Sequence, residues 1–360
     1  MKALRLTLLF LVTSLQTRAL DSLGQYYTNV YQAEKCILNR DYKNAAQYYE
    51  AAFLFKHAPF TLDICNYSYC AALNNDYDNL IHLSRLLVLK GADTFFFRKS
   101  IYNGFRKSKE WSSLIKEYPQ LTVKRDQTIN YALIKRINDF IYRDQSVHCI
   151  LVNNAKDSEF VARMNRINDS LSESLIALMY ENDYLSEEVI GATFNDSNFV
   201  AYPIYHALVI HEFQKHGDKL TKPMYEAIKK GKIRSDIGLK LMQNGGNPRI
   251  VFDEDYIILH DTLWTMDLRN AIPIRRIVRI LYDTTNIATE KRAEFYCDES
   301  ENIKNKIYYN YRRYIFSKIN KLYYNPFIIV PIAEIMQEEP PKEFYQLFLV
   351  SDYPERFLKN

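Results

Sequence analysis

Glycine is scarce in this chain of 360 residues, which contains only nine. Enzymes that hold nucleotides on glycine-rich loops need glycine where the backbone approaches a phosphate. Neither a GxGxxG nor a GxxxxGK[ST] pattern occurs in the sequence. The sequence therefore predicts no nucleotide cofactor, and its motifs indicate no cofactor of any other kind.

Cysteine pairs with metal-binding spacing are also missing. None of the five cysteines belongs to a CxxC motif, so zinc and thioredoxin-like chemistry have no support. His211 and His216 lie five residues apart, which places them about 140° apart on a helix, whereas a zinc-protease helix needs a spacing of four. We therefore predict no metal site. The odd number of cysteines leaves at least one thiol unpaired, and three possibilities stay open: a buried thiol, a Cys36–Cys65 disulfide or a Cys65–Cys70 disulfide.

Long apolar runs and a strong net charge are lacking as well. The net charge of +4 is slight for this length, so nucleic acid is not an expected partner. The first residues differ from the rest: Lys2 and Arg5 precede an apolar run, and Thr17-Arg18-Ala19 ends it. This pattern is typical of a secretory signal peptide over residues 1–19. We expect an exported bacterial protein, periplasmic or at the cell surface, with no transmembrane segment in the mature chain.

A five-residue motif occurs twice in the next region. Leu38-Asn39-Arg40-Asp41-Tyr42 returns as Leu73-Asn74-Asn75-Asp76-Tyr77, and Glu110-Trp111 resembles a third copy. We expect Tyr42, Tyr77 and Trp111 to hold equivalent places at the start of the second helix of successive hairpins. Small or apolar residues follow at offsets of +3, +7 and +10: Ala45, Tyr49 and Ala52 in the first copy, and Leu80, Ser84 and Leu87 in the second.

This pattern resembles the tetratricopeptide repeat, and the likeness covers about residues 22–119. It implies a short α-solenoid over residues 22–120, in which Gly91 ends a helix and Pro119 stops the last one. Such solenoids hold extended peptides on their concave face, for which Tyr26, Tyr48 and Asn66 are the candidate binding residues. An alternative is that the repeats only provide a surface against which the next domain packs.

Residues 126–151 predict one long helix with a polar pair on its apolar stripe. Asp144 and His148 lie one turn apart on the stripe of Leu133 and Ile137. A buried carboxylate needs a partner, and His148 is the nearest candidate in sequence. A later apolar helix carries His211. We consider two interpretations of Asp144, His148 and His211: a structural Asp–His pair, or the general base and orienting group of an uncharacterised hydrolase.

The order of residues in this region is similar to a bacterial family of unknown function with a DQ motif. The likeness lies in Asp144-Gln145, Asp169 on a helix, Gly191 in a turn, and a buried helix with a histidine before Gly231. It covers about residues 126–245 and implies an exported α-helical domain attached to repeats, without implying an activity.

The last region, residues 246–360, follows a turn cluster and is basic. We predict a short strand between Arg249 and His260, and a helix from Ile274 to Tyr282. Residues 304–324 alternate basic side chains with tyrosines, which suits a solvated helix face or a polyanion-binding surface. Taken together, the sequence predicts an all-α protein and favours a binding or assembly module for a protein or peptide partner over an enzyme.

Overall fold

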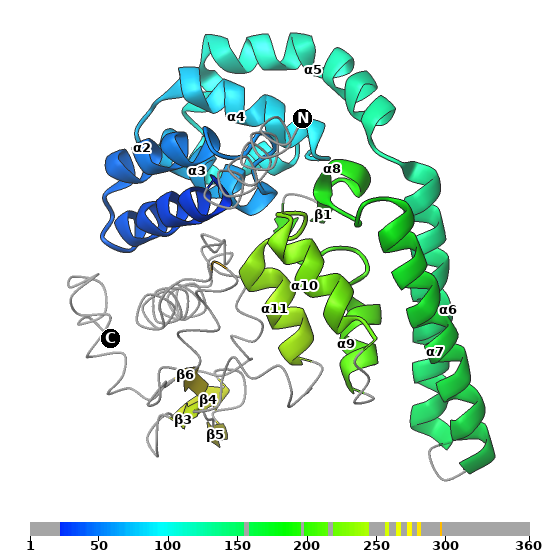
Figure 1. The fold of residues 1–360 in the computed structure, drawn as a ribbon. Coiled ribbons are helices and arrows are strands. Elements are labelled where there is room, and N and C mark those ends of the chain that lie inside the picture. The colour runs from blue at the N-terminus through cyan, green and yellow to red at the C-terminus, as the bar shows by residue number, and fades with distance from the viewer. Residues whose placement is uncertain are drawn as a thin grey trace, which may run out of the picture. The chain divides into compact units, whose positions relative to one another are not determined.

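A computed structural model describes residues 22–154, 158–195, 198–214 and 219–244, four short strands between 256 and 281, and Tyr296. The chain divides into two compact units, residues 1–250 with 295–297 and residues 251–294 with 298–360. Helices dominate the described residues (Figure 1), so the all-α prediction is confirmed. The two regions predicted as a solenoid and a separate helical domain both lie in the first unit.

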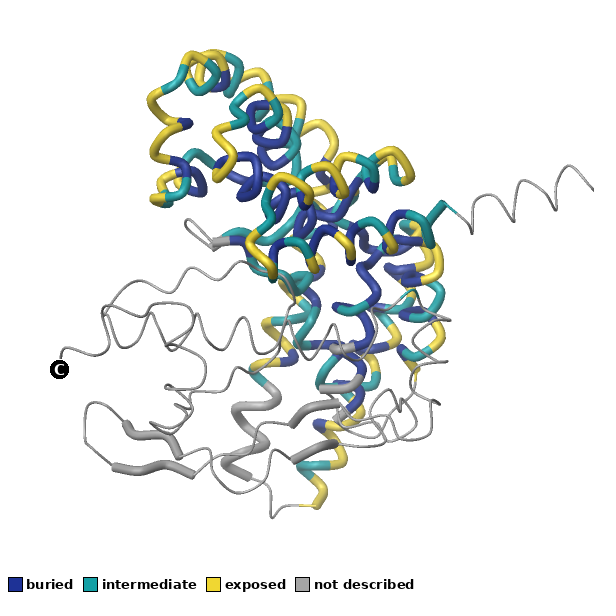
Figure 2. The backbone as a smooth tube through the Cα atoms, turned by 90° about the vertical axis from the view of Figure 1, so that its left-hand side faces the viewer, coloured by how far each residue is buried: buried dark blue, intermediate teal, exposed yellow. Residues whose placement is uncertain are grey.

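Helical hairpins open the first unit. A helix over residues 22–38 pairs with α2 (Tyr42–Phe53), and α3 (Thr61–Leu73) pairs with α4 (Tyr77–Leu89). Nearly every residue of α3 is buried, because α3 packs between α2 and α4. Buried and exposed stretches alternate along the described helices, as Figure 2 shows. The side chains at the three predicted offsets are all buried in both copies: Ala45, Tyr49, Ala52, Leu80, Ser84 and Leu87.

The two copies of the five-residue motif fold into the same turn. Arg40 and Asn75 have positive φ values of 61° and 57°. The amides of Asp41 and Asp76 each donate a 2.9 Å bond to a carbonyl five residues earlier. Each aspartate then caps the following helix, accepting a 3.2 Å bond from the amide three residues on. The sequence repeat is therefore a repeated helix-end and helix-start signal.

Trp111 does not hold the place of the two tyrosines, so that expectation is wrong. Tyr42 and Tyr77 are the first residues of their helices, but α5 (Lys109–Thr128) is capped by Ser108, which accepts from the amide of Trp111. Trp111 thus occupies the third helical position. Three short 3₁₀ helices replace the first helix of a third hairpin: η1 (Phe96–Arg98), η2 (Ser100–Tyr102) and η3 (Phe105–Lys107).

The prediction that Pro119 ends its helix is also wrong, because α5 continues to Thr128 and bends along its length (Figure 1). Proline removes one backbone donor, which costs about 3 kcal/mol in a helix interior. Tertiary contacts hold the turn before it: Leu114 is buried, and Glu117 accepts bonds of 2.7 and 2.8 Å from Arg85 of α4. Packing against α4 therefore outweighs the lost hydrogen bond.

Two long helices follow as a pair, α6 (Tyr131–Asn154) and α7 (Ser158–Glu181) (Figure 1). The predicted helix from residue 126 therefore begins five residues later, after a break at Ile129 and Asn130. A short α8 (Glu187–Ile190), a β1–β2 hairpin (Thr193–Asn195 and Asn198–Val200), α9 (His206–Gln214), α10 (Thr221–Lys229) and α11 (Ser235–Asn244) complete the unit.

Within the second unit, the structure describes four short strands. They are β3 (Tyr256–Ile258), β4 (Trp264–Asp267), β5 (Ile272–Arg275) and β6 (Arg279–Leu281), and β3 pairs with β6 while β4 pairs with β5, both antiparallel. The strand predicted between Arg249 and His260 is present. The helix predicted from Ile274 to Tyr282 is wrong, because β-branched residues favour strands and Pro273 is tolerated in a two-stranded sheet.

Several predictions fall outside the described residues. They concern the leader over residues 1–19 and the basic stretch over residues 304–324. Among the helices that the structure describes, none combines the length and apolar character needed to cross a membrane.

Candidate functional site

An arginine with no exposed surface lies where the first helix, α3 and α11 meet. Arg234 immediately precedes α11, and its Nη2 atom donates a 2.7 Å hydrogen bond to Oε1 of Glu34 on the first helix. The same nitrogen lies 3.4 Å from Oδ1 of Asp63 on α3. Nη1 lies 3.1 Å from Oδ2 of Asp236, which is partly exposed. We call Arg234, Glu34, Asp63 and Asp236 the arginine cluster.

Two neighbouring tyrosines of the first helix complete the arginine cluster. Tyr26 donates a 2.5 Å hydrogen bond to Oδ2 of Asp63 and accepts one of 3.3 Å from the amide of Phe60. Tyr27 accepts a 3.0 Å bond from the amide of Ser235, and its ring stacks on Tyr296 at 5.9 Å. The hairpins therefore bind both the side chain of Arg234 and the backbone that follows it.

Burial and charge act in opposite directions in this cluster. Burial raises the pKa of Asp63 to about 7, although the charge of Arg234 opposes this shift. Burial by itself lowers the pKa of Arg234, but the carboxylates of Asp236, Asp63 and Glu34 outweigh it and raise the pKa well above its ordinary value. The guanidinium thus stays charged, while Asp63 changes its protonation state near neutral pH.

Two further contacts join the hairpins to the later part of the unit. Lys56 donates a 3.0 Å bond to the carbonyl of Gly231, three residues before Arg234. Glu187 accepts bonds from the amide and hydroxyl of Thr61, at 2.8 and 2.6 Å, and so caps the start of α3. The same carboxylate lies 3.3 Å from Nζ of Lys90. Distant residues thus supply the capping that α3 lacks locally.

A small cavity of about 30 Å³ adjoins the arginine cluster. Drug-sized ligands occupy pockets of roughly 300–1,000 Å³, so this cavity is suited to one or two waters and not to such a ligand. Its walls come from α8, the β1–β2 hairpin and the start of α11, with Phe60, Glu187, Tyr205 and Arg234 among them.

The structure brings together two of the three residues suggested as a catalytic group. Oδ2 of Asp144 on α6 lies 2.6 Å from Nδ1 of His211 on α9. The side chain of Asp144 is 3% exposed and that of His211 is 18% exposed. Asp144 is thus paired with a histidine 67 residues away, and it also accepts a 3.1 Å bond from the side chain of Gln145. The side chain of His148 lies outside the described part of the structure. A histidine that contacts a carboxylate through Nδ1 has the orientation found in general bases.

Polar groups continue beside this pair. Glu212 is buried and accepts a 2.5 Å bond from the hydroxyl of Ser172 on α7. Asn168, one turn before Ser172, is also buried. No set of three or more histidine, cysteine or acidic side chains among the described residues has the geometry of a metal site. The cavity beside Arg234 has other walls, so it does not serve Asp144 or His211.

The three residues suggested for a peptide groove do not share a surface. Tyr26 and Asn66 have no exposed surface, whereas Tyr48 on α2 is 38% exposed. Tyr26 bonds to Asp63 and so belongs to the arginine cluster. The face of the hairpins around Tyr26 and Asp63 is therefore covered by the chain itself.

Neither suggested disulfide is formed, since Cys36, Cys65 and Cys70 are free thiols. Cys65 and Cys70 are buried on α3, and burial raises the pKa of both thiols. They behave as small apolar side chains, as one of the three interpretations of the sequence held.

Arg234 was not predicted from the sequence as a site residue. It lies in the segment Lys232-Ile233-Arg234-Ser235-Asp236, where an arginine two residues before an aspartate is typical of an exposed ion pair. Its partner Glu34 is 200 residues away. The available local signal was Glu34 itself, a charged residue between Val30 and Ile37 on the apolar face of the first helix.

Comparison with protein families, with curated proteins and with solved structures finds no match to this chain.

Proposed function

We propose that the protein is an exported, non-catalytic binding or assembly module whose helical hairpins bind polypeptide. One observation carries this proposal: the face formed by the first helix and α3 binds the segment around Arg234 from 200 residues away. The contacts combine a buried charged hydrogen bond with bonds to the backbone of Ser235 and Gly231. Recognition of this mixed kind is how helical repeat proteins hold extended segments.

Several large apolar side chains of the hairpins are exposed and form the surface that we propose for a second protein. Tyr48 on α2 and Leu54 just after it are 38% and 82% exposed. Leu73, the last residue of α3, and Phe95, in the loop after α4, are also exposed. These side chains lie on or after helices that contact one another in sequence order, and exposed apolar side chains on neighbouring elements favour an interaction surface. A partner protein is therefore the ligand class that we propose, and nucleic acid is not.

Photo-crosslinking in cells tests this function. A photoreactive amino acid is placed at Tyr48 or Leu54, and at Tyr142 on α6 as an exposed control position. We expect one defined adduct from the two hairpin positions, lost when Leu54 is also changed to Glu in the Tyr48-labelled chain. Equal adducts at all three positions, or none at the hairpins, would refute the binding role.

Export is tested separately in the same cells. The mature protein should be found outside the cytoplasm, and its mass should show that about the first 19 residues are removed, as the apolar leader predicts. A full-length chain that stays in the cytoplasm contradicts the exported part of the proposal and leaves the crosslinking test unaffected.

The contact between Asp144 and His211 favours a second candidate function, that of an uncharacterised hydrolase. A histidine oriented by a carboxylate through Nδ1 is the arrangement of a general base. Asp144→Asn decides between the candidates when tested with a panel of chromogenic esters and peptides. Loss of turnover with unchanged unfolding free energy favours catalysis, whereas loss of stability alone favours a structural pair.

A further inference from the structure

A single lysine lies on the aromatic cluster that replaces the third hairpin's first helix. Lys99 stands between η1 and η2, and its Nζ lies 4.4 Å from the ring centre of Phe96 and 5.3 Å from that of Tyr69. It also donates a 2.7 Å hydrogen bond to the hydroxyl of Tyr69. Phe96 and Tyr69 are buried, while Lys99 is half-buried.

The charge around this lysine is unusual for a half-buried ammonium. Lys90 lies 3.3 Å from Glu187, and Lys232 lies 2.9 Å from Asp183. Among the described residues, no carboxylate comes within ion-pair distance of Nζ of Lys99; its partners are two rings and a hydroxyl. Burial lowers the pKa of Lys99 to about 8, and the nearby thiol of Cys65 opposes this shift. A desolvated lysine without a counter-charge is the usual form of a nucleophilic lysine.

We propose that Lys99 is a carbonyl-reactive amine that forms a Schiff base with small aldehydes, and that the Tyr69 hydroxyl relays the proton. The neutral amine attacks the carbonyl carbon, and the nitrogen loses a proton as the carbonyl oxygen gains one, which gives a carbinolamine. The hydroxyl group then leaves as water, its proton supplied through Tyr69, and the nitrogen lone pair forms the C=N bond of an iminium ion. The iminium nitrogen returns its proton to the Tyr69 oxygen, which restores the relay and leaves the neutral imine. One aldehyde and one amine thus give one imine and one water.

The position of Tyr69 supports this role. Its hydroxyl lies at hydrogen-bond distance from the reacting nitrogen, which is the placement that a proton relay requires. The ring is fixed by packing against Tyr102, with 5.8 Å between centres, and the hydroxyl of Tyr102 in turn is 2.7 Å from Ser68. Lys99 and Tyr69 are therefore held by a rigid aromatic environment.

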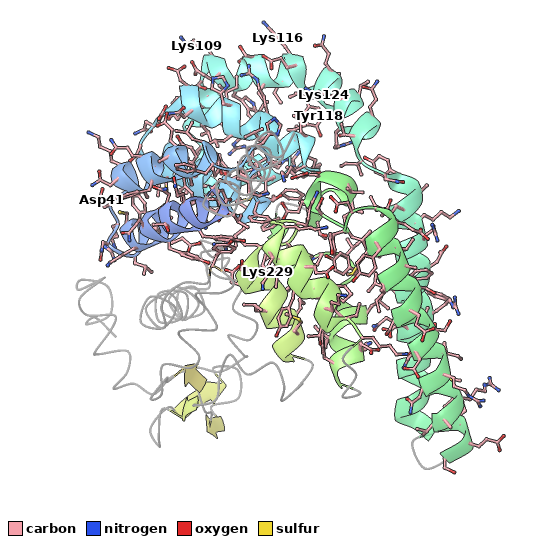
Figure 3. The ribbon with its side chains drawn as sticks, viewed as in Figure 1. Asp41, Lys109, Lys116, Tyr118, Lys124 and Lys229 are labelled. Atoms are coloured by element: carbon pink, nitrogen blue, oxygen red, sulfur yellow. The ribbon has the colours of Figure 1, made fainter. Side chains whose placement is uncertain are left out.

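Reductive trapping on the full chain tests the proposal. The protein is treated with acetaldehyde and sodium cyanoborohydride at pH 7.5, and the hydride converts any imine to a stable secondary amine that peptide mass spectrometry locates. Lys116 and Lys124 are internal controls, because both are exposed on α5 (Figure 3). We expect Lys99 to be trapped at least about tenfold faster, and this advantage to shrink as the pH approaches ~10, where ordinary lysines also lose their proton. Trapping at Lys99 that is no faster than at the controls overturns the proposal.

Two variants separate the reaction from a merely structural lysine. Lys99→Arg should fold and lose the label at this position. Tyr69→Phe keeps the ring and its packing, so we expect trapping at Lys99 to slow several-fold while the urea unfolding midpoint stays close to that of the unaltered chain. Unslowed trapping in a folded Tyr69→Phe chain overturns the relay. If Tyr69→Phe fails to fold, the rate at Lys99 relative to Lys116 in the unaltered chain still decides whether the amine is reactive.

Discussion

Nη2 of Arg234 lies 2.7 Å from Oε1 of Glu34, and both side chains are fully removed from solvent although 200 residues separate them. A buried ion pair is weak evidence of net stabilisation, because desolvation offsets much of the attraction between the charges. Removal of one partner is costly, however, since the other charge is then buried alone. The pair therefore specifies which segment covers the hairpins.

Arg234→Met should lower the free energy of unfolding by roughly 3–5 kcal/mol, because it leaves Glu34 and Asp63 without their cation. Urea denaturation followed by circular dichroism measures the change. Lys109→Met is the matched control, because the side chain of Lys109 is 92% exposed, and it should change stability by less than about 0.5 kcal/mol. The double variant with Glu34→Gln should recover part of the loss. A loss below about 1 kcal/mol in the single variant would contradict the importance of the cluster.

Asp63 should make stability depend on pH. Its pKa in the folded chain is about 7 because it is buried, whereas an exposed aspartate has a pKa of ~3.9. The folded state binds the proton more tightly, so the contribution of Asp63 is complete below about pH 4 and is lost as the pH rises through about 7. Asp63→Asn removes this slope, which is at most about 1.4 kcal/mol per pH unit. Urea unfolding of both chains from pH 4.5 to 8 measures the difference, and parallel profiles would exclude titration of Asp63.

The two repeated turns should respond alike to loss of their caps. Asp41→Ala and Asp76→Ala each remove an acceptor for the first turn of a helix, so each should cost about 1 kcal/mol in thermal or urea unfolding. Ser108→Ala removes the corresponding acceptor of α5 and should have a similar effect. A large cost at one cap and none at another would show that the turns are not energetically equivalent.

Gly191 should tolerate no larger residue. Its φ is 69°, and a Cβ there would lie 2.8 Å from Cδ1 of Ile129 and 3.2 Å from the carbonyl of Lys90. We expect Gly191→Ala to destabilise by about 1–3 kcal/mol. Gly24→Ala is the control, because its Cβ would make only ordinary contact with Tyr296 and alanine favours a helix, with an effect from zero to about 1 kcal/mol of stabilisation. Comparison of the two midpoints in urea checks the expectation, and equal effects would contradict it.

Local sequence signals predicted the elements that local forces determine. The repeated motif contains both the turn and the residue that caps the next helix. The two hairpins and their buried faces could therefore be predicted from Asp41, Asp76 and the apolar or small residues at the three offsets after them. The all-α fold class and the end of α4 followed likewise, since Gly91 has the positive φ value expected after a helix.

Long-range packing decided the features that the sequence did not predict. Pro119 lies inside α5 because contacts with α4 outweigh its local preference, and Trp111 is displaced because three 3₁₀ helices replace a regular one. The contact between Asp144 and His211 joins two helices that lie 67 residues apart in sequence, so no local pattern determines it. Arg234 gave no local signal because its partners lie at the other end of the unit.

Glu187 provides the start of α3 with an acceptor that the preceding residues lack, and it lies 126 residues further along the chain. During synthesis, the ribosome must therefore release more than half of the first unit before this inner helix gains its full set of bonds. Until then, the first turn of α3 lacks its capping acceptor, so the amino-terminal hairpins complete their hydrogen bonds only after a downstream carboxylate has been synthesised.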